Sequence, residues 1–558
     1  MIRRAAASLA ALAFAAPAVA QTNGPPATPI DPARLSQIDR ALSTDAMEGR
    51  GPATQAEPKV IDYIVGQMKA AGLQPGGADG AWTQDVPLAR FEVTGPVTLS
   101  LAAGGKAQAL TQGDQAVVQT LVPVNHVDIR NAPLVFCGYG VKAPELGWDD
   151  FKGVDLHGKI AVVLINDPDF EAPAGSPVAG KFGGKAETYY GRWTYKYEEA
   201  ARQGALGMLI VHETAPASYG WNTVKNSNAN AQFDIVRDDP TKSHALLQGW
   251  IQRDLAVDMF KKAGLNFDAE KRRAMTAGFR PVALKGETFS ASYAVNSSRI
   301  VSHNILGVLK GSRHPEQTVF YTAHWDHLGV GAPDAKGDRI YNGAVDNADG
   351  VASILELARV FARAPRTARS VVFMSVTAEE KGLLGSEYYA THPIYPLAKT
   401  AAVFNIDALD TDGPARDFTI SGDSKTTLQD DLAAAAARDG RRFTPDPIPE
   451  AGHFFRSDHF SFAKAGVPAV SIGSGQDLYA GGVAAGKAWQ EDYVKTRYHQ
   501  PADEWSPSMD WRGVALDLGL IYDVGRTIAN ESSWPGWKAG SEFRAVREAS
   551  AAQRAPGA

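Results

Sequence analysis

Two histidines and four carboxylates in the second half of the chain stand where they could bind metal ions and perform acid–base chemistry. Most of them follow a short apolar run typical of a buried strand, and one precedes a predicted helix. The residues are His324, Asp346, Glu379, Glu380, Asp407 and His499. In open α/β sheets, ligands bind beyond the carboxyl ends of the strands. We therefore expect these side chains to meet at one edge of a sheet.

This donor set suits a pair of divalent cations. Zinc accepts imidazole nitrogen and carboxylate oxygen at about 2.0–2.2 Å, and two histidines with three carboxylates can bind two ions if one carboxylate bridges them. The positive charge of such a site lowers the pKa of a bridging water towards neutrality. The pair Glu379-Glu380 can supply one ligand and one base. Asp326 can accept the second N–H of the His324 ring.

Each motif alone is weak evidence for a metal site. A His-x-Asp segment is usually structural, a Glu-Glu pair is most often the solvated start of a helix, and an aspartate after a strand is commonly a helix cap. The order of all the motifs along one chain is much more specific, because each follows an apolar strand or opens a helix. The combination therefore favours a metal site.

The same segments resemble those of the di-zinc exopeptidases of clan MH, which include aminopeptidase Y, secreted bacterial leucyl aminopeptidases and glutamate carboxypeptidase II. Five segments carry the resemblance in the family's order: AHWDHLG, GAVDNADGVA, TAEEKGLLGSEYY, FNIDALD and YHQPAD. The resemblance covers nearly the whole chain after residue 20. It implies two zinc ions per chain and a peptide substrate.

The resemblance also implies which residues bind the metal ions. Asp346 would join both ions, His324 and Asp407 would hold one, and His499 and Glu380 would hold the other. The implied ligands are His324, Asp346, Glu380, Asp407 and His499. The peptide bond after the bridging aspartate is implied to be cis.

Three further residues receive catalytic roles from the resemblance. Glu379 would be the general base that takes a proton from the bridging water, and Asp326 would orient His324. Tyr498 would stabilise the oxyanion. In the segment FRSDHFSF, Arg456 is a candidate substrate contact, although a structural turn with an ion pair explains it equally well.

Other polar and aromatic residues near these motifs have simpler explanations. His327 and His459 are expected to form hydrogen bonds behind the ligands or in the cleft rather than to bind metal. Tyr479 either lines a specificity pocket or packs within its loop. Packing in the core or at the rim is the expected role of Trp489, Trp505 and Trp511.

The apolar runs TVFYTA, SVVFMSV, AAVFNI and VPAVSI alternate with amphipathic segments such as VASILELARVFA. This alternation predicts an α/β fold with a phosphorylase/hydrolase-like mixed, mostly parallel sheet sandwiched by helices. The segments KIAVVLIND and EEAARQGALGMLIVHE resemble a small α/β protease-associated domain inserted before the first metal histidine, as in the glutamate carboxypeptidase II type and unlike the carboxypeptidase G2 type.

The predicted domains follow from these patterns and from the N-terminus. Arg3 and Arg4, the apolar residues 5–16 and the triplet Ala-Val-Ala at 18–20 form a signal peptide pattern, which predicts export to the periplasm or the medium. The predicted divisions are a signal peptide at 1–20, an N-terminal part of the peptidase domain at 21–114, a protease-associated domain at 115–285, the catalytic domain at 286–535 and a tail at 536–558.

Composition excludes several classes of protein. The 558 residues are 44% hydrophobic and 21% charged, so the chain is globular rather than disordered. A net charge of −6 without a basic stripe argues against nucleic-acid binding. No stretch after the signal peptide approaches the length of a membrane span. The single cysteine, Cys137, lies in an apolar run and is expected to be buried.

We therefore expect an exported zinc aminopeptidase that removes N-terminal residues from peptides. A carboxypeptidase or dipeptidase on the same site is an alternative. A glutaminyl cyclase, with one zinc ion, and a non-catalytic relative of the transferrin receptor type are less consistent with the intact ligand set. Side-chain preference and oligomeric state stay open.

Overall fold

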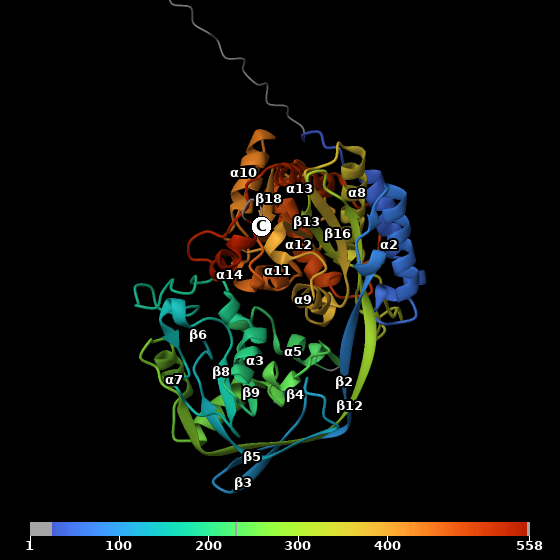
Figure 1. The fold of residues 1–558 in the computed structure, drawn as a ribbon. Helices are drawn as coiled ribbons and strands as arrows, with labels where there is room; N and C mark the ends of the chain where they lie inside the picture. Colours follow the sequence, from blue (N-terminus) through green and yellow to red (C-terminus); the bar gives the residue numbers. More distant parts are fainter. Residues whose placement is uncertain (1–24, 229–230, 423, 555–558) are drawn as a thin grey trace, which may run out of the picture.

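The computed structural model describes residues 25–228, 231–422 and 424–554. The predicted signal peptide at 1–20 lies outside this part of the chain. The described residues form a large lobe and a small lobe, which lie at the top and bottom of Figure 1. The large lobe carries all the predicted metal ligands.

A mostly parallel sheet forms the centre of the large lobe, as predicted. Its parallel strands lie in the order β20-β17-β13-β16, and an antiparallel strand flanks each side, β18 beside β20 and β12 beside β16. The bounds are β12 Val282–Leu309, β13 His314–His324, β16 Arg369–Val376, β17 Thr400–Ile406, β18 Asp417–Ile420, β19 Arg442–Phe443 and β20 Ala469–Ser474.

Helices cover both faces of this sheet because its strands are apolar on both sides. Along β13, Val319 and Tyr321 face one helical layer, whereas Phe320 faces the other. The first layer contains α1 (Pro32–Leu42), α2 (Glu57–Ala71), α8 (Asp349–Arg363), α10 (Thr427–Arg438) and α13 (Arg512–Asn530). The second layer contains α9 (Leu384–Thr391) and α11 (His459–Lys464).

The small lobe has its own mostly parallel sheet. Strands β5, β8, β9 and β11 are parallel, and β4 pairs antiparallel with β11. Buried Cys137, as predicted, belongs to the core on one face of this sheet, with α3, and α6 and α7 cover the other. The bounds are β4 Ala116–Gln119, β5 His126–Phe136, β8 Ile160–Leu164, β9 Gly207–His212, β11 Leu247–Gln252, α3 Trp193–Arg202, α6 Arg253–Lys262 and α7 Phe267–Ala274.

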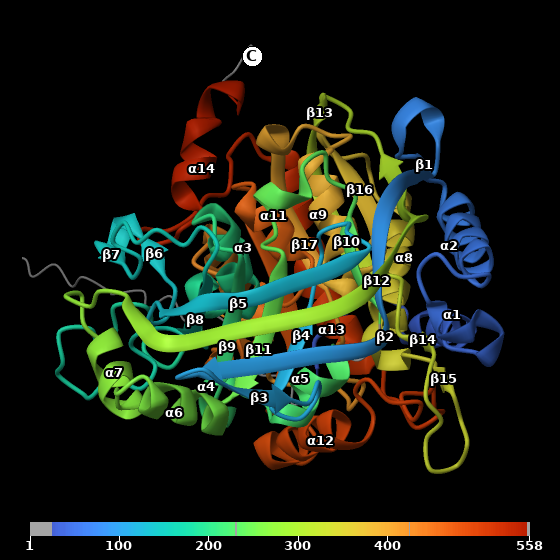
Figure 2. The ribbon, with the colours of Figure 1, turned by 90° about the horizontal axis from the view of Figure 1, so that it is seen from below.

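Two long antiparallel strands, β2 (Thr83–Ala103) and β12, connect the lobes and lie side by side in Figure 2. β12 pairs with β16 of the large lobe near its end and with β5 of the small lobe near its start. The predicted boundary at 285/286 therefore falls inside a continuous strand. The division at 115–285 stays a prediction.

Shorter elements complete the described chain. None of its helices is both long and apolar enough to cross a membrane. The remaining strands and α-helices are β1 Gln74–Pro75, β3 Lys106–Leu110, β6 Lys142–Ala143, β7 Trp148–Asp149, β10 Gln232–Ile235, β14 Gly329–Val330, β15 Ile340–Tyr341, α4 Thr214–Ala217, α5 Trp221–Ser227, α12 Gly482–Thr496 and α14 Arg544–Ala549.

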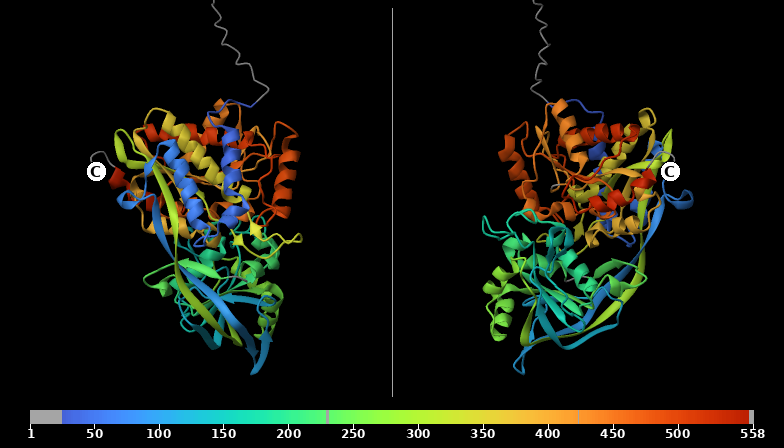
Figure 3. Two further views of the ribbon diagram at one scale, coloured as in Figure 1. Left: turned by 90° about the vertical axis from the view of Figure 1, so that its right-hand side faces the viewer. Right: turned by 60° about the vertical axis from the view of Figure 1, so that its left-hand side comes forward.

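The lobes also contact each other below the large sheet, as the two views of Figure 3 show. The backbone N–H of Glu187 donates to the carbonyl of Pro449 at 3.2 Å. The ring of Tyr189 lies 5.3 Å from that of Phe460 in α11. These contacts place residues 187–189 of the small lobe against the loop that leads to Arg456.

Close packing of α13 on the sheet gives a direct test of this fold. A Cβ on Gly525 would lie 1.9 Å from the hydroxyl of Tyr321, whereas a Cβ on Gly66 in α2 would meet no atom within 4 Å. We expect Gly525→Ala to destabilise the protein by about 1–3 kcal/mol. The matched Gly66→Ala should stabilise it by about 0.5–1 kcal/mol, because alanine favours the helix. Thermal unfolding midpoints that move in the same direction would contradict this packing.

Candidate metal centre

The predicted ligands meet at the carboxyl edge of the large sheet. His324 is the last residue of β13, and Asp407 follows β17 directly. Glu380 lies in the turn after β16. Asp346 lies in the irregular turn before α8, and His499 follows α12. The parallel strand order therefore brings together residues separated by up to 175 positions in the sequence.

Asp346 contacts both histidines through different oxygens. Its Oδ1 lies 3.3 Å from His324 Nε2, and its Oδ2 lies 3.1 Å from His499 Nε2. His324 Nε2 is also 3.1 Å from Asp407 Oδ1, and His499 Nε2 is 3.2 Å from Glu380 Oε2. The peptide bond between Asp346 and Asn347 is cis, as the resemblance implied. These contacts define two donor groups that share one carboxylate.

The spacing of these donors fits two zinc ions. Ligands bound tetrahedrally at about 2.0 Å stand about 3.3 Å apart. The four ligand-to-ligand contacts measure 3.1–3.3 Å, which matches the edges of such tetrahedra. The set of two imidazoles and three carboxylates also agrees with the ligands that zinc accepts.

The electrostatics of the cluster favour positive charge at the same place. Burial would lower the pKa of His499, but Glu380 and Asp346 raise it to about 9. Burial likewise opposes protonation of His324, yet Asp407 and Glu379 raise its pKa well above the ordinary value. The carboxylates therefore attract cations strongly, and protons or metal ions can supply that charge.

Asp326 supports the site differently from its predicted role. The second N–H position of His324, Nδ1, lies 3.0 Å from the backbone carbonyl of Asp326, whereas the carboxylate is 3.8 Å away. The carboxylate instead accepts the backbone N–H groups of Glu379 at 3.0 Å and Glu380 at 3.4 Å. Asp326 therefore positions the turn that carries the predicted base and a predicted ligand.

The predicted catalytic side chains lie beside the donors. Glu379 Oε2 is 3.9 Å from His324 Nε2, and burial and then the charges of Asp407 and Glu380 raise the pKa of Glu379 well above its ordinary value, although His324 lowers it. The ring of Tyr498 stacks on that of His499 with centroids 3.9 Å apart.

Arg456 lies close enough to Tyr498 for its charge to favour the tyrosinate, although burial raises the Tyr498 pKa overall. Arg456 is half-buried.

Three further buried side chains lie near the centre. His327, expected behind the ligands, is fully buried and lies 2.6 Å from Glu380 through Nδ1. His459 packs against Phe454, and burial lowers its pKa to about 3. Among the described residues its ring nitrogens have no hydrogen-bond partner, contrary to expectation, and it belongs to neither donor group. Asp458 is a buried carboxylate whose pKa burial raises to about 7.

Arg50 and Asp503 hold the metal-site loops in place. The buried Arg50 donates to four backbone carbonyls, and Asp503 accepts the backbone N–H of Asp346 at 3.0 Å. Asp503 lies in the motif that contains His499, so its spacing offered a signal, whereas nothing near Arg50 did. The carbonyls that accept from Arg50 belong to Leu42, Trp325, Asn342 and Gly343.

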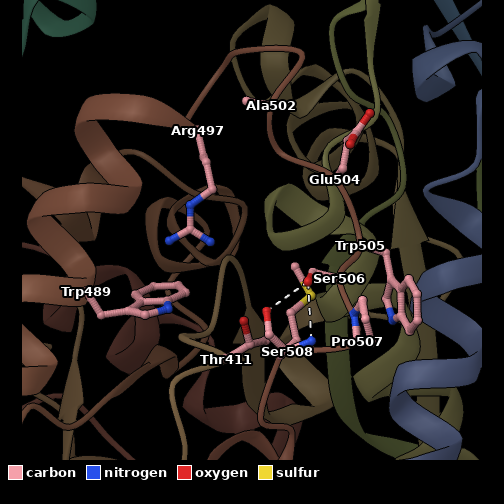
Figure 4. A pocket seen from close by; sticks show the side chains of 10 residues that line it. Thr411, Trp489, Arg497, Ala502, Glu504, Trp505, Ser506, Pro507 and Ser508 are labelled. Carbon is pink, nitrogen blue, oxygen red and sulfur yellow. Dashed lines mark hydrogen bonds between the residues drawn. The ribbon is translucent and has the colours of Figure 1, made fainter.

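The three tryptophans near the motifs lie in the core or at the rim of a hollow. Trp511 is buried in the large core. Trp489 and Trp505 are half-buried and line a hollow of about 350 Å³ together with Arg497, beside the loop that follows α12 (Figure 4). The Tyr479 ring packs against the guanidinium of Arg416 at 4.7 Å, so Tyr479 connects its loop to the residue that precedes β18.

The Arg50 contacts predict a large effect of one substitution. Arg50→Met leaves four buried carbonyls without their donor, and each unsatisfied group costs about 1–3 kcal/mol. We expect a loss of stability of at least about 3 kcal/mol, measured as a lower thermal midpoint in chelator. The exposed Arg363→Met in α8 is the control and should change stability by less than about 0.5 kcal/mol. Equal midpoints for the two variants would contradict the role of Arg50.

Comparison with known proteins agrees with this centre. Residues 304–516 match the model of peptidase family M28. A probable zinc metalloprotease of Pyricularia oryzae is 30% identical over 155 residues, which cover 28% of this chain and 27% of that protein. Aminopeptidase YwaD of Bacillus subtilis is 28% identical over 209 residues, covering 36% of this chain and 39% of that protein. The matches thus span well under half the length of these relatives.

The solved structure of an aminopeptidase from Aneurinibacillus sp. strain AM-1 superposes with a TM-score of 0.50 at 21% identity and covers 90% of this chain and 94% of that one. It shows that the fold is shared. All the predicted metal ligands, from His324 to His499, lie inside the matched segment. Residues 304–516 of this chain are therefore similar to peptidase family M28 over the whole of the candidate centre.

Proposed function

We propose that the protein is an exported zinc-dependent aminopeptidase that binds two zinc ions and removes N-terminal residues from peptides. The observation that carries the proposal is the contact of Asp346 with both His324 and His499 beside the glutamate Glu379. One carboxylate shared by two donor groups is the arrangement that a two-ion site requires. The relatives named aminopeptidase and zinc metalloprotease support the same activity.

Each ion supplies Lewis-acid chemistry when bound, polarising the scissile carbonyl and lowering the pKa of water. Glu379 accepts a proton from the attacking water and delivers it to the leaving amine. Asp326 holds Glu379 in place by accepting its backbone N–H. The hydroxyl of Tyr498 donates a hydrogen bond to the oxyanion that develops on the substrate. Since Tyr498 stays protonated because of its burial, it can act as that donor.

The balance of charge favours a substrate with a free amino group. Beyond the three carboxylates proposed as ligands, Glu379 and the buried Asp458 face the same centre, and the charge of Asp458 helps to raise the pKa of Glu379. In their ionised forms these two carboxylates would attract a protonated α-amino group of the substrate and would repel a free carboxylate.

A second candidate, a carboxypeptidase or dipeptidase, is favoured by one observation. The half-buried guanidinium of Arg456 lies near Tyr498 and His499, where it could bind a substrate carboxylate. Substrates that differ only in their termini separate the two candidates.

Two coarser proposals complete the assignment. Residues 115–285 would be a protease-associated domain that borders the substrate region, supported by the packing of Tyr189 on Phe460. The basic and apolar pattern at residues 1–20 supports export to the periplasm or the medium.

Hydrolysis assays test the proposed base directly. We expect Glu379→Gln to retain zinc while kcat for aminoacyl-p-nitroanilides falls about 10²–10⁴-fold, because proton transfer is lost. Glu491→Gln, the same change at an exposed glutamate of α12, is the control and should keep full activity. Full turnover by the Glu379→Gln enzyme would reject this base. Cleavage restricted to N-blocked peptides at their C-terminus would establish the second candidate.

A further inference from the structure

His327 is a buried histidine beside the second donor group, which His499 and Glu380 form with the shared Asp346. It is not one of the predicted ligands. It follows His324 by three positions and is 0% exposed. One of its ring nitrogens, Asp346 and Glu380 offer atoms within 4.8 Å of one another. Its ring also lies edge-on to that of His499, with centroids 5.7 Å apart. Any role for this ring therefore concerns the ion that His499 and Glu380 would hold.

The contact distance separates two possible roles of His327. Its Nδ1 lies 2.6 Å from Glu380 Oε1, whereas donors that share a tetrahedral zinc ion stand about 3.3 Å apart. A separation of 2.6 Å is that of a charge-assisted hydrogen bond, which a small rotation of the carboxylate would align, since the two atoms are not aligned for one in this structure. The other oxygen of Glu380, Oε2, is the one that lies 3.2 Å from His499 Nε2. The two oxygens of Glu380 thus face different imidazoles.

The surroundings of His327 fix its ring in this orientation. Its backbone N–H donates to the carbonyl of Arg50 at 3.1 Å. A Cβ on Gly343 would lie 2.6 Å from the ring, so only glycine fits there, and Gly343 adopts a φ of +56°. Within the described residues, neither ring nitrogen of His327 nor Glu380 Oε1 forms a hydrogen bond of good alignment, and the 2.6 Å approach of Nδ1 to Oε1 is the close polar contact between them. The imidazole is therefore held by packing, with Nδ1 next to Glu380 Oε1.

We propose that His327 is a positioning residue for the second zinc ion: its Nδ1–H donates to Glu380 Oε1 and directs Glu380 Oε2 toward the ion shared with His499. The inference rests on the two-ion site of the proposed function. It assigns the ring the tautomer with the proton on Nδ1. Without this hydrogen bond, the carboxylate of Glu380 can rotate. The affinity for the second ion then falls, whereas the affinity for the first ion, at His324 and Asp407, does not change.

Three substitutions at this position test the proposal through metal affinity, independently of turnover. In His327→Asn the amide nitrogen can take the place of Nδ1, and in His327→Gln it can take the place of Nε2. His327→Leu has no hydrogen-bond donor. Each full-length variant is titrated with zinc against a competing chelator, and with Co²⁺ to follow the visible spectrum of each site. We expect His327→Gln and His327→Leu to bind the second ion about 10–100-fold more weakly, with the first ion unchanged. His327→Asn should bind both ions nearly as the wild type does.

His459→Leu is the matched control, because His459 is equally buried but packs on Phe454 rather than on a ligand. It should bind both ions normally. Unchanged zinc affinity in all three His327 variants would overturn the proposal. An equal loss of affinity for both ions in all three variants would also overturn it, because it would indicate a role in packing alone. If His327→Gln kept the affinity for the second ion and His327→Asn lost it, His327 would be a ligand through Nε2. That result would also overturn the proposal. If the affinities follow the prediction but no peptide is cleaved, the proposed function fails and the positioning role stands.

Discussion

The large lobe is organised around a group of buried carboxylates that cannot stay charged without cations among them. Asp346 is the centre of this group, because its two oxygens contact two different histidines. Burying one unpaired carboxylate costs several kcal/mol, so the cluster is stable only when protons or metal ions neutralise it. The two dications of the proposed function would meet this requirement and at the same time create the conditions for hydrolysis. Structure and proposed chemistry thus depend on the same charge balance.

The rest of the lobe places and holds this cluster. Parallel strands deliver His324 and Asp407 to one edge, and backbone hydrogen bonds fix the loops between them. The carboxylates of Asp326 and Asp503 both accept hydrogen bonds from backbone N–H groups in the turns that carry the predicted ligands. Arg50 instead donates hydrogen bonds to backbone carbonyls of two such loops, the one after His324 and the one before Asp346. The geometry of the predicted ligands therefore comes largely from residues outside the ligand set.

Much of this arrangement was predictable from the sequence, for physical reasons. Apolar runs identified the parallel strands, and the position of His324 and Asp407 at the ends of such runs predicted that they meet. Arg50 was not predictable, because its partners are backbone carbonyls and leave no side-chain pattern. The role of Asp326 was only half right, since spacing cannot distinguish its carboxylate from its carbonyl. The sharing of β12 by both lobes was missed because pairing along a strand is a tertiary property.

The central claim is that one carboxylate serves two zinc ions, and the zinc content of two alanine variants tests it most directly. The wild-type chain, Asp346→Ala and Asp407→Ala would be loaded with zinc, dialysed and assayed for metal per folded chain. The account predicts two ions in the wild type, one in Asp407→Ala and none retained in Asp346→Ala, because only Asp346 contacts both donor groups. One ion retained in both variants would show that Asp346 does not bridge and would contradict the account.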